Sequence, residues 1–112
     1  MTKKLYNDFE KVDVRVGKII KVEEPEGLRI NAYKLTIDFG KEIGQKISLA
    51  QITKNYTKKD LMNRLVMGVV NLSPKEIGNY TSEALTLGFT DKNGGVVLAI
   101  PDKDAPLGTK MY

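Results

Sequence analysis

Hydrophobic and polar residues alternate in several short stretches of the chain, which is the pattern of half-buried β-strands. In the stretch 32–39 every second residue, beginning with Tyr33, is large and apolar. The stretch 12–22 alternates likewise until Gly17, where the phase slips, so we expect a bulge or a bend at this glycine. A nearly continuous apolar run predicts a well-buried strand at 66–72. Three more strands are expected, at 45–52, 84–89 and 96–100.

Helix and turn signals separate these strands. Residues 57–63 predict a short helix, because Thr57 and Asp60 have the spacing of a capping box. Asn7 followed by Glu10 indicates another helix start, with room for about one turn before the first strand.

The order of these elements predicts a mainly β fold. Asn93-Gly94 is a strong hairpin signal between the last two strands. A helix between the third and fourth strands favours a five-stranded Greek-key OB-fold barrel with N- and C-terminal extensions. Periodicity alone also allows a small sandwich or an SH3-like barrel. Since no linker, repeat or low-complexity segment is visible, we expect a single domain over residues 1–112.

Composition excludes several kinds of chemistry. The 112 residues include no histidine, no cysteine and no tryptophan. The usual ligands of zinc, haem and iron–sulfur clusters are therefore absent, and neither a Ser–His–Asp nor a Cys–His arrangement can form. We expect a protein that is not an enzyme and has no catalytic residue, metal site or cofactor. The sequence contains neither a signal-peptide pattern nor an apolar run of about 20 residues, so we expect no membrane insertion and a cytoplasmic location.

The positive charge is concentrated in the middle of the chain. The net charge is +4, and residues 41–64 contain six cations and two anions. The rest of the chain is balanced, so this segment accounts for the whole excess. A local basic patch is typical of a surface that binds polyanions, and a solvated lysine-rich face is the alternative.

Several motifs resemble the tRNA-binding-domain family, in the same order and over nearly the whole chain. The family includes the C-terminal module of some methionyl-tRNA synthetases and the CsaA-type export chaperones, and this chain is most similar to the CsaA branch. The matching stretches are 13–17 (Asp-Val-Arg-Val-Gly), 34–40 (Lys-Leu-Thr-Ile-Asp-Phe-Gly), 50–53 (Ala-Gln-Ile-Thr), 70–74 (Val-Asn-Leu-Ser-Pro), 82–83 (Ser-Glu) and the closing 101–110.

The resemblance implies an OB-fold homodimer in which the N- and C-terminal extensions form the interface. It also implies a non-catalytic protein that binds tRNA by its shape. The CsaA branch is associated in addition with unfolded polypeptides bound for export. Two functions therefore remain open, a tRNA binder and a chaperone that holds unfolded preproteins in apolar grooves of a dimer.

The loop before the last barrel strand carries the candidate RNA contacts. The match of pattern gives Ser82 and Leu85 the positions associated with tRNA, and Lys75 supplies charge for the phosphate backbone. Asn71 is a further candidate. The alternative is that Asn71, Ser82 and Glu83 satisfy backbone groups of the protein itself.

Two positions in this loop depart from the family pattern. Asn79 stands where the family usually has glycine, and a positive φ there would be tolerable for asparagine. Glu76 stands where the family has a basic residue. An anion beside Lys75 weakens the local attraction for phosphate, which lowers the expected affinity for tRNA.

Further lysines and tyrosines complete the candidate site. The sequence contains only three arginines, which favours recognition of RNA shape over reading of base edges. Tyr33 is in phase with the apolar face of its strand, so we expect it in the core. Phe89 belongs to the same group of aromatics that can stack on bases or line a peptide groove. The lysines expected to contact RNA phosphates are Lys34, Lys46, Lys54 and Lys58, and the tyrosines expected to contact a bound peptide or base are Tyr56 and Tyr80.

Overall fold

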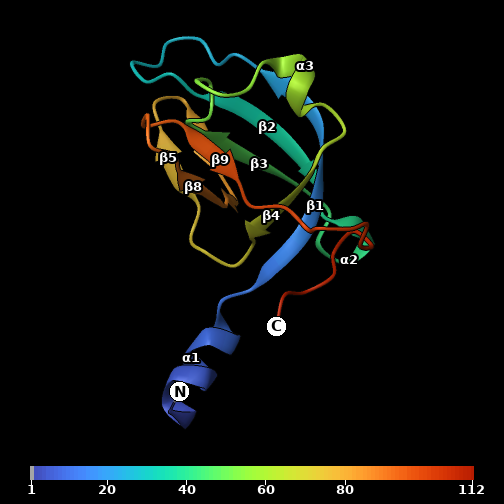
Figure 1. Cartoon of the computed structure of the whole chain (residues 1–112). Coiled ribbons are helices and arrows are strands. Elements are labelled where there is room, and N and C mark those ends of the chain that lie inside the picture. Colours follow the sequence, from blue (N-terminus) through green and yellow to red (C-terminus); the bar gives the residue numbers. More distant parts are fainter. Residues whose placement is uncertain (1) are drawn as a thin grey trace.

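The computed structural model describes residues 2–112, and its centre is a five-stranded antiparallel sheet that curls into a nearly closed barrel (Figure 1). The strands lie in the order β3-β2-β1-β4-β7, so that β3 and β7 are the two edges. Their bounds are β1 (Val14–Glu23), β2 (Tyr33–Asp38), β3 (Gln45–Ala50), β4 (Leu65–Val69) and β7 (Leu85–Thr86). Together with α3 (Lys58–Leu61) between β3 and β4, this arrangement is the OB fold.

The interior of the barrel follows from the alternation of the strands. On β2 the residues predicted to share a face, Tyr33, Leu35 and Ile37, are all buried. Phe39 continues this face beyond the strand and has no exposed surface. The core cluster contains these four residues and side chains from the other barrel strands. Tyr33 is therefore a core residue, as predicted.

The three helices of residues 2–112 lie outside the barrel strands. The predicted capping box of α3 is present, because the Thr57 hydroxyl accepts the Asp60 N–H (3.1 Å) and the Asp60 carboxylate accepts the Thr57 N–H (2.9 Å). These bonds hold the pKa of Asp60 below its usual value. The sequence did not predict α2 (Gly40–Ile43), a single turn between β2 and β3.

The N-terminal helix is longer than the sequence predicted. α1 spans Lys3–Lys11, nine residues, and projects away from the barrel (Figure 1). Thr2 caps it by accepting the Leu5 N–H at 3.2 Å, whereas Asn7 lies within the helix. The prediction of about one turn starting at Asn7 was therefore wrong, because the effective cap lies five residues earlier.

Two hairpins form separate two-stranded sheets beside the barrel sheet. β8 (Gly88–Thr90) and β9 (Val96–Leu98) form the hairpin that Asn-Gly predicted. The other hairpin, β5 (Lys75–Ile77) with β6 (Tyr80–Ser82), was not predicted, because the sequence indicated a loop there. Gly78 has the positive φ of its turn (59°), as at the first position of a type II′ turn, and Asn79 does not. The Asn79 departure therefore places no strain on the turn.

The irregularity in β1 lies beyond the predicted position. Gly17 pairs regularly with Val66, and the register shift falls between Ile19 and Lys21. Gly17 serves a different purpose, since a Cβ on it would lie 2.5 Å from Ile37 Cγ2. The apolar run at 66–72 also leaves the sheet sooner than predicted, after Val69.

The C-terminal segment returns to the start of β1. Gly108 N–H donates to Val16 C=O (2.8 Å), and Val16 N–H donates to Thr109 C=O (3.0 Å). The Arg15 guanidinium donates to Gly108 C=O (2.9 Å) and pairs with the Asp13 carboxylate (2.6 Å), which raises the pKa of Arg15. None of the helices in residues 2–112 is long and apolar enough to cross a membrane.

Candidate functional site

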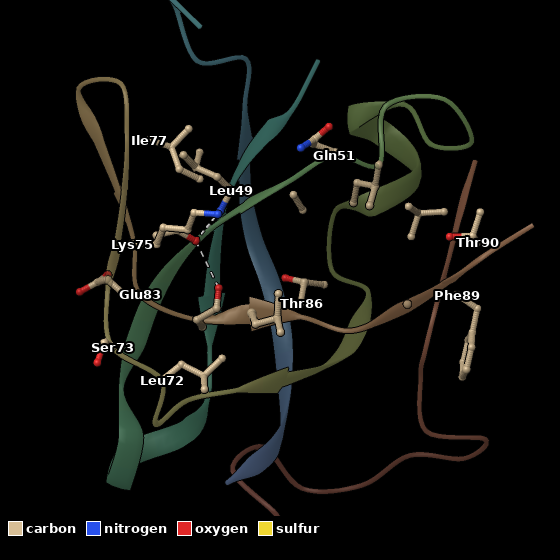
Figure 2. A pocket seen from close by; sticks show the side chains of 17 residues that line it. Leu49, Gln51, Leu72, Ser73, Lys75, Ile77, Glu83, Thr86, Phe89 and Thr90 are labelled. Carbon is tan, nitrogen blue, oxygen red and sulfur yellow. Dashed lines mark hydrogen bonds between the residues drawn. The ribbon is translucent and has the colours of Figure 1, made fainter. Parts of the chain in front are cut away.

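A surface groove of about 440 Å³ runs along the open side of the barrel (Figure 2). One wall is the end of β3 with the residues that follow it, including Leu49 and Gln51. The opposite wall is β7 and β8, including Thr86 and Phe89, and the β5–β6 hairpin closes one end with Lys75. The groove thus brings together residues from three separate parts of the chain.

Exposed apolar side chains dominate this surface. Phe89 is 70% exposed, and Leu72 and Leu85 are each 49% exposed. A large aromatic ring held this far into solvent has a free face on which a base or an apolar side chain can stack. Leu85, predicted from the sequence, therefore lies in a surface able to bind either kind of partner.

Ser82 lines the groove, and its hydroxyl bridges two backbone groups there. It accepts the Leu49 N–H (3.1 Å) and donates to the Ala84 C=O (3.3 Å), the two dashed lines in Figure 2. The neighbouring Glu83 carboxylate accepts the Ile47 N–H at 2.9 Å. Both side chains satisfy backbone groups of β3, which is the alternative that the sequence left open.

Asn71 has a similar structural task at the other end of its loop. Its side-chain oxygen accepts the Asp13 N–H (3.0 Å) and its side-chain NH₂ donates to Lys11 C=O (2.7 Å). Asn71 therefore ties the loop to the junction between α1 and β1. It does not line the groove.

Two of the predicted lysines lie beside the groove. Lys75 is exposed and lines it. Lys34 is the cross-strand partner of Leu49, and its Nζ lies 3.8 Å from Glu23 and 5.7 Å from the centre of the Tyr80 ring. Charge for a polyanion is thus available at the hairpin end of the groove.

The other predicted lysines are dispersed. Lys46 is half-buried on β3, Lys54 donates to Asn93 C=O in the β8–β9 turn, and Lys58 pairs with Glu24 (3.7 Å). α2 and α3, which begin and end the basic segment 41–64, lie at different ends of the barrel (Figure 1). The charge that is concentrated in the sequence is therefore not concentrated on one face.

The two candidate tyrosines have hydroxyls that are engaged within the protein. Tyr80 accepts the Glu26 N–H (3.0 Å) and donates to Glu26 C=O (3.1 Å), joining the β5–β6 hairpin to the β1–β2 loop. Tyr56 accepts the Leu98 N–H (3.0 Å), and its ring lies 5.3 Å from the Arg64 guanidinium. Neither tyrosine lines the groove.

Sequence reasoning did not single out the walls of the groove. It included Phe89 only among several aromatics, and it gave no role to Gln51, Thr86 or Leu72. The signal that could have found Leu72 and Phe89 is a large apolar residue next to a predicted strand end, where no core position is available. Within residues 2–112 the structure has no cluster of three or more acidic, His or Cys side chains that could hold a metal ion.

The OB barrel and the open groove beside its last strand define a binding module of the OB-fold class. The chain belongs to the tRNA-binding domain family, whose model, described as a putative tRNA binding domain, matches residues 14–110. It is 36% identical over 107 residues to a methionine–tRNA ligase of Thermococcus onnurineus; the match covers 95% of this chain but only 14% of the ligase.

Two solved structures are similar over the full length. The CsaA chaperone protein of Picrophilus torridus is 46% identical with a TM-score of 0.91, and each chain is covered completely. The chaperone CsaA of Bacillus anthracis is 41% identical with a TM-score of 0.90, covering 100% of this chain and 99% of the other.

Proposed function

We propose that the chain is a non-catalytic tRNA-binding protein of the cytoplasm. The observation that carries this proposal is the family match over residues 14–110. The groove supports it, since an exposed Phe89 ring offers a stacking surface and Lys75 stands at the groove end. Because few cations lie near the groove, we expect weak, salt-sensitive binding to RNA shape.

We infer different roles for the candidate residues from the contacts that they make. We expect Lys75, which lines the groove, and Lys34, which lies beside Tyr80, to contact phosphates. Ser82 acts through the protein, because its hydroxyl already bridges Leu49 and Ala84. We therefore expect Ser82→Ala to alter RNA binding by changing the shape of the groove.

Binding of deacylated tRNA across a series of salt concentrations tests the proposal. Lys75→Ala should weaken binding several-fold at low salt and reduce the salt slope by about 1, because one phosphate contact is lost. The matched control is Lys103→Ala, an exposed lysine of the C-terminal segment, which should bind as the parent does. Absence of tRNA binding even at low salt contradicts the proposal.

A second function is favoured by the apolar character of the groove. Leu72, Leu85 and Phe89 offer more exposed apolar surface than binding to a phosphate backbone requires. The similarity to two CsaA chaperones over the full chain points in the same direction. We propose that the groove also binds unfolded polypeptides, including preproteins for export, with an affinity that is insensitive to salt.

We also propose that the protein forms a homodimer. α1 buries none of its residues, yet Leu5, Phe9 and the following Val12 are spaced along one side of it and are 57%, 40% and 44% exposed. A second apolar surface lies around Met111 and Val14, where a cavity of about 240 Å³ opens beside the C-terminal segment. Contact between two copies would cover both extensions.

A further inference from the structure

The barrel has an incomplete seam between β3 and the segment 84–90. The two run in the same direction, and Ala84 N–H donates to Ile47 C=O at 3.2 Å, as in a parallel ladder. The next bond of such a ladder would join Leu49 N–H to Ala84 C=O. The Ser82 hydroxyl stands between these two groups and bonds to both, so the strands are held apart from this point onward.

Backbone groups on the β3 side of the seam point into the opening. Leu49 pairs across β2 with Lys34, and its N–H points away from β2, toward Ser82. Strand geometry alternates with a period of two, so Leu49 C=O and the Gln51 N–H point the same way. Within residues 2–112, neither of these two groups has a hydrogen-bond partner.

Backbone groups on the opposite side of the seam also point into the opening without a hydrogen-bond partner among the described residues. Asp91 N–H donates to Gly95 C=O, and Ala99 N–H donates to Leu87 C=O, which fixes the phase of the β8–β9 ladder. In that phase the N–H and C=O groups of Gly88 and Thr90 point away from β9. In the described part of the chain these groups also lack partners. Gly88 and Thr90 line the groove, as do Leu49 and Gln51.

We propose that the groove binds an extended polypeptide by strand addition, with main-chain hydrogen bonds to the free edges at Leu49–Gln51 and Gly88–Thr90. This inference rests on the second function proposed above and names the way in which the polypeptide is held. A peptide strand presents N–H and C=O groups at the spacing of the unpaired edge groups, and it leaves alternate side chains for apolar walls. The bound segment completes the barrel, whose open edges are otherwise satisfied only by solvent.

The chemistry of the walls favours a peptide over RNA as the occupant of the seam. Among the described residues Lys75 is the only cation that lines the groove, and the groove also carries the Glu83 carboxylate. A nucleic-acid backbone needs several cations along its path, whereas a neutral extended peptide needs none. The preferred occupant is therefore uncharged, rich in β-branched and aromatic residues, and free of proline at the bonding positions.

N-methylated peptides provide the test. The probe is a fluorescently labelled neutral ten-residue peptide rich in Val, Thr and Leu, prepared in two series with N-methyl groups on even or on odd positions. Alternate N–H groups of a strand face opposite edges, so each series removes the donors to one edge of the seam and should bind about tenfold more weakly than the parent or worse. The matched control carries the same number of added methyl groups on its side chains, as Val-to-Ile changes, and should stay within about twofold of the parent because it keeps every backbone donor.

A protein variant tests the same bonds from the other side. Gln51→Pro removes the Gln51 N–H at an exposed position that follows β3 and should weaken the unmethylated peptide about tenfold. Gln51→Ala keeps this N–H and should bind normally. Urea midpoints and circular dichroism spectra that match the parent show that both variants are folded, and the methylated peptides give an answer on the parent protein in any case.

The possible results distinguish peptide binding itself from strand addition as its mode. Binding of both N-methylated series within about twofold of the parent peptide overturns strand addition and leaves peptide binding intact. Failure of every peptide to bind overturns peptide binding and strand addition together. A third experiment uses an apolar fluorescent dye bound in the groove. If an unstructured oligonucleotide displaces this dye and the peptide does not, the groove is assigned to RNA, which also overturns the inference.

Discussion

Phe39 shows how two glycines shape the interior of the barrel. A Cβ on Gly17 would lie 2.7 Å from Phe39 Cε1, and one on Gly68 would lie 2.8 Å from Phe39 Cζ. The aromatic ring, which is fully buried, therefore packs directly on the backbone of β1 and β4. Side chains at these two positions are excluded by packing, since neither glycine has a positive φ.

We expect Gly17→Ala to destabilise the protein by about 1–3 kcal/mol, because the new methyl group overpacks the core against Ile37 and Phe39. Urea denaturation measures the change in the free energy of unfolding. Phe39→Leu, which makes room for the methyl group, should destabilise less in the Gly17→Ala background than in the parent. Strict additivity of the two substitutions would contradict this account of Gly17.

Single residues were predictable where their partners are close in the sequence. Thr57 and Asp60 are three residues apart, and the capping box they form was visible in the sequence. The partners of Ser82 and Asn71 lie 33 and 58 residues away, at Leu49 and Asp13. A polar side chain in a loop gives no sign of which distant backbone group it satisfies, so only the general alternative could be stated.

At the scale of elements, the β8–β9 turn is organised by one carboxylate. Asp91 accepts hydrogen bonds from the Asn55 side chain and from the N–H groups of Gly95 and Asn93, each at 2.9 Å. These bonds, the Asn55 bond most of all, hold the pKa of Asp91 below its usual value. The turn is thereby fastened to the loop that precedes α3.

The lowered pKa of Asp91 predicts how stability changes in acid. The carboxylate binds a proton less readily in the folded state, so its stabilisation is complete above the unfolded pKa of about 3.9 and is lost as the pH falls through the folded value. Asp91→Asn should lower stability at neutral pH and flatten the decline below about pH 4. Urea midpoints measured against pH, with Asp104→Asn as an exposed control, check this. Parallel curves for the parent and Asp91→Asn would contradict it.

The elements differ in how well the sequence predicted them. The barrel strands and the β8–β9 hairpin were expected, because alternation and Asn-Gly are local signals. The β5–β6 hairpin was missed because its strands have only three residues each and its turn depends on Gly78, which is followed by Asn79. Strands this short are stabilised by neighbouring elements, here the contact of Tyr80 with Glu26, and such contacts are invisible in the sequence.

At the scale of the whole molecule, none of the side chains of α1 is buried against the rest of the described residues. Phe9→Asp should abolish the proposed dimer, because it places a charge in the centre of the exposed apolar side of the helix. Sedimentation equilibrium at micromolar concentration should give twice the 12.5 kDa chain mass for the parent and 12.5 kDa for Phe9→Asp. Asn7→Asp changes the opposite side of α1 and should remain dimeric. A parent protein that sediments as a monomer contradicts the proposal.

The return of the C-terminal segment to β1 has a consequence for the order of folding. Arg15 and Gly108 are joined although 93 residues separate them, so the first half of β1 obtains its second neighbour only from the end of the barrel sequence. During translation, the backbone groups of Val14 and Val16 on this edge of β1 would stay unpaired until residues 108–111 had been synthesised. Contacts between such distant residues also slow folding. The protein should therefore reach its native sheet only after synthesis has passed this segment, and a pause in translation before it would leave that edge open to other chains.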